Sequence, residues 1–402
     1  MSMEFNPYSR ELHEDPYPVY RWMREEAPLY RNDELDFWAL SRFDDLWTVV
    51  HDPETYSSAR GVTLTANAAE ADDEGMADVL PVMIQMDPPR HDELRKLVKG
   101  PFTPRQVGRL EDSVRRIARE LLANFVEHGE ANLVADFAAP LPTMVIADML
   151  GVDRADLPMF RRCSDAVIRG DSDDRADRRA AVAAGQELAA YFSHIVADRR
   201  QDPRDDLVTQ LAHSHEGDAR LSELEILGFC FLLLAAGNET TMNLISNSAV
   251  LLDRYRDQRA LLVDDPSLMR DAIEELLRYD SPVQVLVRTT TRDVELYGEV
   301  VPADSKVALV FGAANRDDRE FDDPDRLDLR RRPERHLAFG HGVHYCLGAA
   351  LARLEGKVAY EELLAHIPDF SVTTDHVERV HTGIIRGVER LPIAFTPARV
   401  AA

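Results

Sequence analysis

The segment 336-HLAFGHGVHYCLGAALARLE-355 decides the fold. Its cysteine, Cys346, lies where a loop containing Gly340 and Gly342 meets the start of a predicted helix. The backbone N–H groups at a helix start and the positive end of the helix dipole both stabilise a thiolate. Gly348 has no Cβ, so the backbone there can approach a flat ligand closely. The helix itself is predicted by one apolar stripe: Leu347, Leu351, Leu354 and Val358.

Three uses of Cys346 are compatible with these residue types. A lone cysteine next to glycines is most often a buried structural thiol. A zinc ion could bind His341, His344 and Cys346, although no fourth ligand lies at short spacing and Phe339 would then have no role. The third use is ligation of haem iron by the thiolate.

The full segment resembles the cysteine loop of the cytochrome P450 family, F-G-x-G-x-H-x-C-x-G followed by A-R. Every named position of that pattern is filled: Phe339, Gly340, Gly342, His344, Cys346, Gly348, Ala352 and Arg353. The resemblance runs from Asp15–Pro28 to Gly383–Ile393, so it covers nearly the whole chain. It implies a heme b whose iron is bound by the Cys346 thiolate, and it disfavours the other two uses. The cofactor-binding residues that it implies in this segment are Phe339, Gly340, His344, Cys346 and Gly348.

The resemblance also implies a mainly α fold with a minor β portion, in which a triangular helical domain contains a long central helix and small sheets. A single domain over residues 1–402 is expected. Residue patterns favour the same fold class. Ser222 and Glu225 make a predicted capping box, and the helix that follows, to about Tyr255, would be about 50 Å long. A further helix is predicted from Ser267 to about Tyr279. Strands are predicted by alternating apolar residues: Val283, Val285, Val287, Val307 and Leu309.

A polar stretch, 235-AAGNETT-241, interrupts the long apolar helix. Taken alone it is a tolerated surface stretch, a kink, or a loosened turn that opens a groove beside a metal. It matches the family motif A-G-x-E-T, which implies that Glu239 and Thr240 are the acid and the alcohol of a catalytic proton-delivery pair. Thr240 could instead bond back to the carbonyl of Ala236. The resemblance places three residues of this stretch against the cofactor: Ala236, Gly237 and Thr240.

Cations are needed for the two propionates of a haem, because carboxylates drawn into a protein require donors. By resemblance the donors are His91, Arg95, Arg288 and His344, with His336 as a weaker candidate. Taken alone, His91 and Arg95 are four residues apart on a predicted helix and would be surface residues.

Glu275 and Arg278 are three residues apart on the helix predicted to end near Tyr279. Such a pair is usually a surface ion pair that contributes about 0.2–0.5 kcal/mol. The resemblance implies instead a structural motif behind the cysteine loop, which a later arginine completes. Arg326 is the best match for that arginine.

Composition narrows the possible partners. Lys plus Arg number 47 against 72 Asp plus Glu, so the net charge is −25, which disfavours nucleic acid and anionic membranes. The longest apolar run, Phe229–Gly237, is short for a membrane span, and the N-terminus is polar. The three cysteines are too few for a disulfide framework. A cytoplasmic monomer is expected.

A local basic stretch contrasts with this acidity. Residues 90–109 contain six basic residues against two acidic ones, Asp92 and Glu93. A positive patch on an acidic protein suits an acidic electron donor. The resemblance implies that electrons come from a ferredoxin and its ferredoxin reductase, and we expect docking near Lys96 and Lys99.

The activity implied is insertion of one oxygen atom from O2 into an apolar small molecule, by hydroxylation or epoxidation. The substrate class stays open among terpenoids, steroids, fatty acids and macrolide-like compounds. Two alternatives are a peroxide-driven enzyme of the same fold and a haem protein without turnover. Two loops, Gly61–Asp78 and Gly170–Arg179, are candidate lids. The pocket residues predicted by family position are Val82, Met83, Ile84, Leu233, Ala236, Val283, Val285, Leu286, Ile384 and Ile385.

Overall fold

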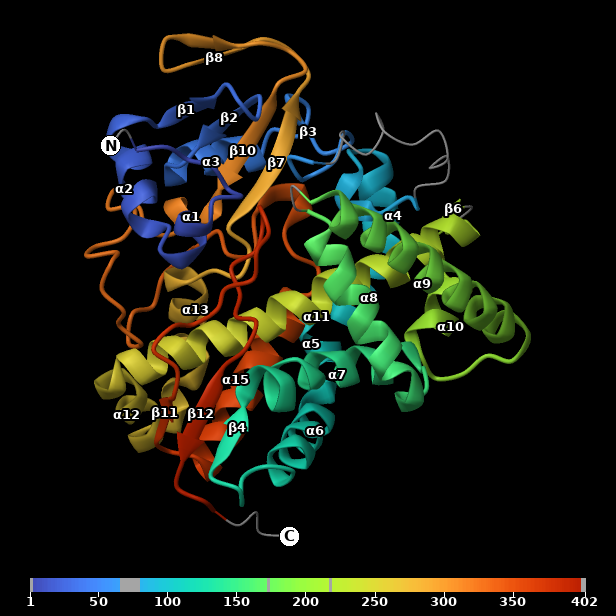
Figure 1. The fold of residues 1–402 in the computed structure, drawn as a ribbon. Coiled ribbons are helices and arrows are strands. Elements are labelled where there is room, and N and C mark those ends of the chain that lie inside the picture. Colours follow the sequence, from blue (N-terminus) through green and yellow to red (C-terminus); the bar gives the residue numbers. More distant parts are fainter. Residues whose placement is uncertain (1–2, 66–79, 172–173, 217–218, 399–402) are drawn as a thin grey trace.

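The computed structural model describes residues 3–65, 80–171, 174–216 and 219–398. Helices form most of it, and a sheet of N-terminal and late strands lies at one corner (Figure 1). The helices are α1 (Arg10–Glu14), α2 (Tyr17–Glu26), α3 (Phe43–Val50), α4 (Arg90–Val98), α5 (Pro104–Val107), α6 (Glu111–Ala123), α7 (Pro140–Leu150), α8 (Leu157–Arg169), α9 (Arg175–Gln201), α10 (Leu207–Ala212), α11 (Glu223–Arg254), α12 (Arg256–Asp264), α13 (Met269–Tyr279), α14 (Phe311–Ala314) and α15 (Ala349–His366). The strands are β1 (Leu29–Asn32), β2 (Phe37–Leu40), β3 (Tyr56–Ser57), β4 (Glu130–Asn132), β5 (His215–Glu216), β6 (Ala219–Arg220), β7 (Val285–Thr290), β8 (Val294–Leu296), β9 (Glu299–Val301), β10 (Lys306–Val310), β11 (Phe370–Val372) and β12 (Pro392–Phe395). The predicted fold class, mainly α with a minor β portion, is confirmed.

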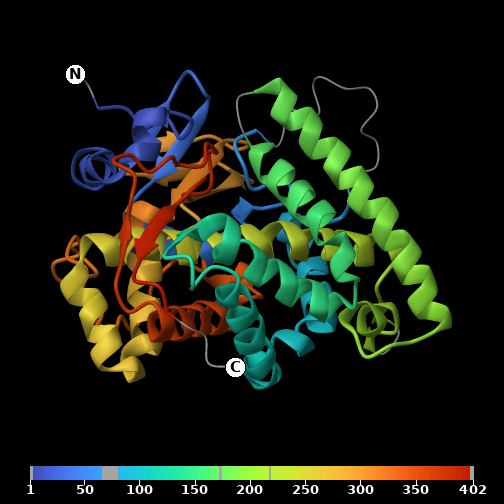
Figure 2. The same ribbon diagram turned by 60° about the horizontal axis from the view of Figure 1, so that its bottom comes forward.

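Helix α11 is the predicted long central helix, and it crosses the middle of the molecule in both views (Figures 1 and 2). Its start has the predicted capping box, in which Ser222 Oγ accepts from the Glu225 N–H and Glu225 Oε2 accepts from the Ser222 N–H. The helix is continuous through residues 235–241, so of the alternatives for this stretch the loosened turn is not formed. Among the described residues α11 alone is long and apolar enough to cross a membrane, but most of its apolar stretch is buried inside the fold, as expected of a core helix.

The largest sheet has the strand order β1-β2-β10-β7-β3, with β10 parallel to β2 and the other pairs antiparallel. Side chains alternate across β7. Val285 and Val287 pack into the apolar cluster beneath α1 and α2, whereas Leu286 and Arg288 point to the other face, toward α11. This strand therefore carries one of the predicted cations, Arg288, into the interior.

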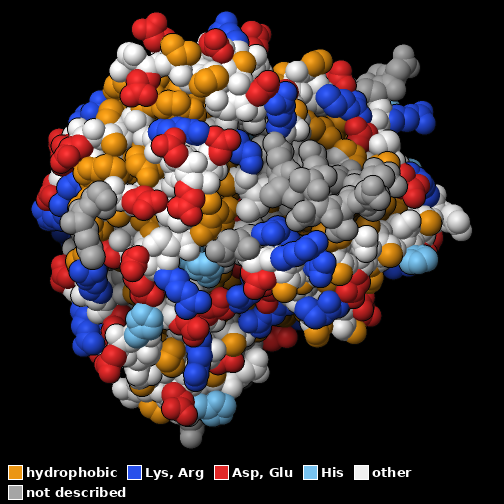
Figure 3. All heavy atoms as spheres, turned by 45° about the horizontal axis from the view of Figure 1, so that its top comes forward, with side chains coloured by type: hydrophobic (Ala, Val, Ile, Leu, Met, Phe, Trp, Pro, Cys, Tyr) orange, Lys and Arg blue, Asp and Glu red, His pale blue; other side chains and the backbone are white. Residues whose placement is uncertain are grey.

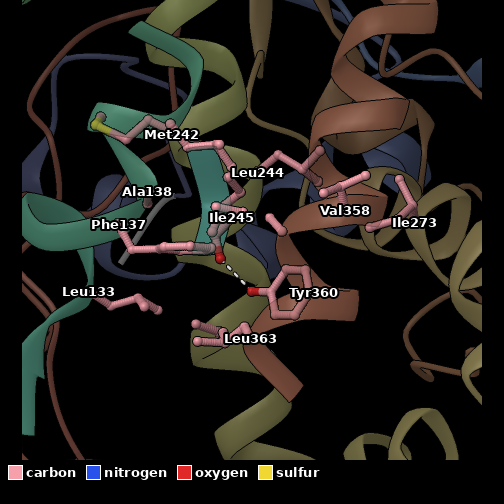
Figure 4. Packing of buried hydrophobic residues seen from close by; sticks show 14 of the residues in the cluster. Leu133, Phe137, Ala138, Met242, Leu244, Ile245, Ile273, Val358, Tyr360 and Leu363 are labelled. Carbon is pink, nitrogen blue, oxygen red and sulfur yellow. Dashed lines mark hydrogen bonds between the residues drawn. The ribbon is translucent and has the colours of Figure 1, made fainter. Parts of the chain in front are cut away.

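The main core joins α11 to α15, the helix that follows Cys346. In Figure 4 the Tyr360 ring lies among leucine, valine and phenylalanine side chains, and its hydroxyl donates to the Ile245 carbonyl on α11 at 2.5 Å. Tyr360, Leu363 and Val358 are fully buried. Complete burial of one such apolar side chain contributes about 1.5–3 kcal/mol. This packing fixes the position of α15, and thus of the cysteine loop at its start.

The buried ion pair behind the cysteine loop has a different third member from the one predicted. Arg278 donates to both oxygens of Glu275, at 2.7 and 2.8 Å, and neither side chain is exposed. Arg331, and not Arg326, completes the cluster, with its Nε 3.1 Å from Glu275 Oε1. The Arg326 side chain is 66% exposed, and its ion-pair partner is Asp328 at 4.0 Å. The expectation for Arg326 was wrong because a turn after Asp328 brings the later arginine back toward α13.

One predicted loop is partly helical. Residues 175–179 belong to α9, whose start is capped by Asp174 as its carboxylate accepts from the Ala176 N–H. The alanines and arginines that follow are good helix formers, and the prediction gave them too little weight. The other predicted lid, Gly61–Asp78, lies outside the described residues from position 66 onward. Acidic and basic side chains are interspersed over the face seen in Figure 3.

Candidate haem site

A cavity of about 250 Å³ lies between α11, α4, β7 and the cysteine loop. All eleven residues predicted to bind the cofactor line it: His91, Arg95, Ala236, Gly237, Thr240, Arg288, Phe339, Gly340, His344, Cys346 and Gly348. They come from four separate parts of the chain, and the fold brings them to one place.

The cysteine loop presents bare backbone to this cavity. A Cβ added to Gly340 or Gly348 would meet nothing within 4 Å, so both glycines border open space. At Gly342, by contrast, φ is +67° and an added Cβ would lie 2.0 Å from the Val50 carbonyl oxygen, so only glycine fits. The Cys346 N–H donates to the Phe339 carbonyl at 2.9 Å, which closes the loop. The result is a flat backbone surface that can lie against a planar group.

Opposing effects act on the pKa of the Cys346 thiol. Burial raises the pKa of the Cys346 thiol, while the N–H groups of Gly348 and Ala349 and the guanidinium groups of Arg95 and Arg353 lower it. Because Gly348 caps α15, these N–H groups lie at a helix start, as the sequence predicted. A metal ion in the cavity would favour the thiolate further.

One edge of the cavity is strongly cationic. Arg288 is 5% exposed, and its side chain donates to the Val287 carbonyl at 2.8 Å but to no carboxylate among the described residues. Burial lowers the pKa of Arg288 to about 10. Burial, followed by the nearby Arg288, His91 and Arg95, lowers the pKa of His344 to about 3.

The same edge contains an unpartnered ring nitrogen. His91 is fully buried, and its Nε2 atom has no hydrogen-bond partner in the described structure. Its ring lies 4.3 Å from that of His344, centre to centre. Burying cations and an unpartnered ring nitrogen costs free energy unless an anion binds to them. The two propionates of a haem meet that need, so the residues present fit the group.

The predicted proton-delivery pair is split between two cavities. Thr240 lines the cavity of Cys346, and its hydroxyl donates to the Ala236 carbonyl at 2.6 Å. Glu239 faces a second cavity of about 70 Å³ together with Asp165, Arg161 and Arg169 of α8. Burial, and then the neighbouring carboxyl of Asp165, raise the pKa of Glu239 well above its ordinary value.

His336, the weaker propionate candidate, does not line the cavity. Its Nε2 atom is 2.9 Å from Glu274 Oε2, and Arg353 donates to the same carboxylate. Burial alone would raise the pKa of Glu274, but hydrogen bonds from His336 and Arg353 lower it to about 2. Arg353 also lies over the Phe339 ring, 4.4 Å from its centre. This ion pair supports the cysteine loop from behind.

Six of the ten predicted pocket residues line the cavity: Met83, Ile84, Leu233, Ala236, Val283 and Leu286. Val285, Ile384 and Ile385 were wrong, because they face a separate cavity of about 30 Å³. Val285 is on the opposite side of β7 from Leu286, and Val82 is buried outside the cavity. Residues that the sequence did not indicate include Phe102, Ile146, Phe229, Leu232, Thr241 and Glu355.

Helical periodicity could have indicated Phe229 and Leu232, which lie on the same face of α11 as Ala236. No sequence signal connected Ile146 of α7 with this site. Its Cδ1 atom would lie 2.4 Å from a Cβ on Gly237, so Gly237 allows α7 to pack closely against α11.

Comparison with known proteins shows which family has this architecture. The family model described as Cytochrome P450 matches residues 172–386. The chain is 41% identical over 386 residues to Cytochrome P450 130 of Mycobacterium tuberculosis, with 94% of each chain covered. The structure of CYP109Q5 from Chondromyces apiculatus has a TM-score of 0.90 at 36% identity and full coverage of both chains. That of CYP109E1 from Bacillus megaterium in complex with testosterone has a TM-score of 0.87 at 34% identity, with 96% of this chain and 100% of that chain covered.

These similarities extend over almost the entire length of the chain, and they agree with a cysteine at a helix start beside a cavity that fits haem. Such proteins hold haem iron through a cysteine thiolate, and they use O2, a redox partner and a small-molecule substrate. The chain belongs to the cytochrome P450 family and is a haem-thiolate monooxygenase whose iron ligand is Cys346.

Proposed function

We propose that this enzyme hydroxylates or epoxidises a neutral apolar small molecule, using O2 and two electrons from a ferredoxin and its reductase. The observation that carries the proposal is that Cys346 and Thr240 line one cavity whose remaining lining is mostly apolar. A hydroxyl on the α11 side of a thiolate-bound haem suits proton delivery to oxygen.

The cofactor would be held at two places. Cys346 binds the iron, and the cationic edge of Arg95, Arg288, His91 and His344 would bind the propionates. When bound, the haem supplies the O2 chemistry, and its thiolate ligand favours O–O cleavage. The chain contributes orientation, protons and exclusion of water.

The substrate class is inferred from the residues that line the cavity away from the cationic edge. The α11 side offers Phe229, Leu232 and Leu233, and β7 offers Leu286. The two arginines that line the cavity, Arg95 and Arg288, are assigned to the propionates, which leaves no arginine or lysine among the described lining residues for a substrate carboxylate. Burial of apolar surface therefore favours a neutral ligand of steroid or terpenoid type. Testosterone in the solved CYP109E1 complex supports this choice.

The electron donor proposal rests on α4. Arg90 is engaged with Glu225 and Glu93, and Arg95 reaches into the haem cavity. Four basic residues of this stretch are exposed and have no ion-pair partner among the described residues: Lys96, Lys99, Arg105 and Arg109. A cationic surface next to the cysteine loop would attract an acidic ferredoxin. We also propose a cytoplasmic, monomeric enzyme.

The test is turnover of steroid and terpenoid candidates under labelled O2 with a ferredoxin and its reductase. We expect one labelled oxygen atom in the product. In Thr240→Ala, electrons should be consumed with little product, because protons reach the oxygen poorly. Equal product from peroxide in both proteins, with none from O2, would favour the peroxide-driven alternative, and haem binding without any product would favour a non-catalytic haem protein.

A further inference from the structure

Helix α11 separates two cavities, and neighbouring residues of this helix face one or the other. Thr240 and Thr241 border the haem cavity, whereas Glu239 borders the smaller cavity between α11 and α8. Glu239 is 5% exposed, and its cavity of about 70 Å³ has room for little besides side chains and a water or two. A carboxyl group enclosed in this way is costly to ionise without a cation bound to it.

Four charged groups surround Glu239, and the two arginines among them lower its pKa less than burial and Asp165 raise it. Three belong to α8, namely Arg161, Asp165 and Arg169, and one, Glu389, belongs to the C-terminal segment. Arg169 donates to both oxygens of Glu389, at 2.7 and 2.6 Å, so its charge is already matched. No hydrogen bond or ion pair joins Arg161 to Glu239 or Asp165 in the described structure. The other lining residues are apolar: Val134, Ile168, Met242, Val380 and Val388.

The ionisable neighbour with the strongest effect on Glu239 is another acid, Asp165. Burial is the largest cause that raises the pKa of Glu239, and hydrogen bonding with Asp165 is the second. Two carboxyl groups in contact in a low-dielectric site do not both ionise, and they titrate as a pair. One proton shared between them converts repulsion into a hydrogen bond.

We propose that Glu239 and Asp165 form an acid pair that holds one proton at neutral pH, with Asp165 as the positioning residue that keeps Glu239 protonated. The inference deepens the proposed function, since it names the source of the proton that passes to the Thr240 side of α11.

A route from solvent reaches the other end of the pair. A groove of about 660 Å³ between α7, α8 and α9 shares Arg161, Asp165 and Arg169 with the small cavity. Asp165 therefore borders both spaces. When the pair gives up its proton, its charge changes from −1 to −2, and a hydronium ion in the groove restores the proton and leaves water.

The test uses the infrared carbonyl stretch of protonated carboxyl groups in the ferric holoprotein, titrated with pH. We expect one band that Glu239→Gln abolishes and that persists to above neutral pH in the wild type. Asp165→Asn should lower the midpoint of that band by roughly one pH unit or more, because the partner charge is gone. Asp165→Glu should restore it. Asp177→Asn, which removes an acid of the groove that does not border the small cavity, should leave it unchanged.

An unchanged midpoint in Asp165→Asn, or the absence of any band that depends on Glu239, would overturn the acid pair. The band is read in the resting protein without substrate, so it is independent of turnover. Failure of the wild type to oxidise any apolar compound would count against the proposed function and leave this result intact. A second readout is the pH profile of coupling between electron use and product, whose upper limb should shift to lower pH in Asp165→Asn only.

Discussion

The Nη2 atom of Arg95 donates a hydrogen bond to the carbonyl oxygen of Tyr345, at 2.5 Å, one residue before Cys346. This bond ties α4 to the cysteine loop, so the exposed Lys96 on this helix and Lys99 at its C-cap lie close to the side on which the iron ligand is held. Residues that position the ligand and residues available to an electron donor thus share one rigid element.

Reversing the charge of this element should slow electron transfer. We expect Lys96→Glu with Lys99→Glu to lower the rate of haem reduction by ferredoxin by about tenfold or more at low salt. Stopped-flow reduction under carbon monoxide measures this rate. Arg10→Glu is the control, since Arg10 is also exposed and its helix α1 lies apart from α4 (Figure 1). Equal rates in both variants would contradict docking at α4.

Removing Arg288 should weaken haem retention. Its guanidinium is buried without a carboxylate partner, and burial lowers its pKa to about 10. A hydrogen bond to a charged group contributes about 1.5–3 kcal/mol, so Arg288→Met should lose haem to an apomyoglobin acceptor about ten to a hundred times faster. Arg292→Met, in the exposed turn after the same strand, should retain haem normally. Normal retention in Arg288→Met would show that the cationic edge does not hold the propionates.

The buried cluster at Glu275 predicts different effects for two arginines. Arg331→Ala leaves part of a fully buried carboxylate unpaired and should lower the free energy of unfolding by about 3 kcal/mol. Arg326→Ala removes an exposed side chain and should change it by less than about 0.5 kcal/mol. Chemical denaturation of both variants compares them, and the opposite order would refute the assignment of Arg331.

Glu355 predicts a pH dependence of stability. Burial raises the pKa of Glu355 from 4.5 to about 8, although Thr241 lowers it slightly by hydrogen bonding. The folded protein then binds a proton that the unfolded chain releases, so this contribution is complete below pH 4.5 and is lost as the pH rises to about 8. The slope is about 1.4 kcal/mol per pH unit over this range.

Glu355→Gln should remove that slope, because an amide does not titrate. The measurement is the free energy of unfolding between pH 5 and 8 for both proteins, with Glu361→Gln, a partly exposed acid of the same helix paired with Arg115, as the control. Parallel curves for the wild type and Glu355→Gln would contradict a protonated Glu355.

Local patterns predicted the parts of the structure that short segments encode. The capping box at Ser222 set the start of α11, and the stripe beginning at Leu347 predicted α15. The cysteine loop was predicted most completely, because its glycines, Cys346 and the following helix are contiguous in sequence.

Contacts between residues far apart in the chain could not be predicted from the sequence, for physical reasons. Arg331 replaced Arg326 because only the tertiary path of a turn decides which arginine returns to Glu275. Val285 was assigned to the wrong side of the sheet, because side chains alternate along β7 and Val285 faces away from the side on which Leu286 lies. The neighbour of Glu239 on α8, Asp165, has no motif that connects it to α11, and only the packing of the two helices brings the acids together.

The central claim is that the Cys346 thiolate binds haem iron. Its most direct test is the absorption spectrum of the purified holoprotein, reduced with dithionite under carbon monoxide, beside that of Cys346→His. The wild type should show the strongly red-shifted Soret band from which the family takes its name, and the variant should show the shorter-wavelength band of a histidine-ligated haem. Folded wild-type protein that takes up no haem, or that gives the shorter-wavelength band at neutral pH, would contradict the account.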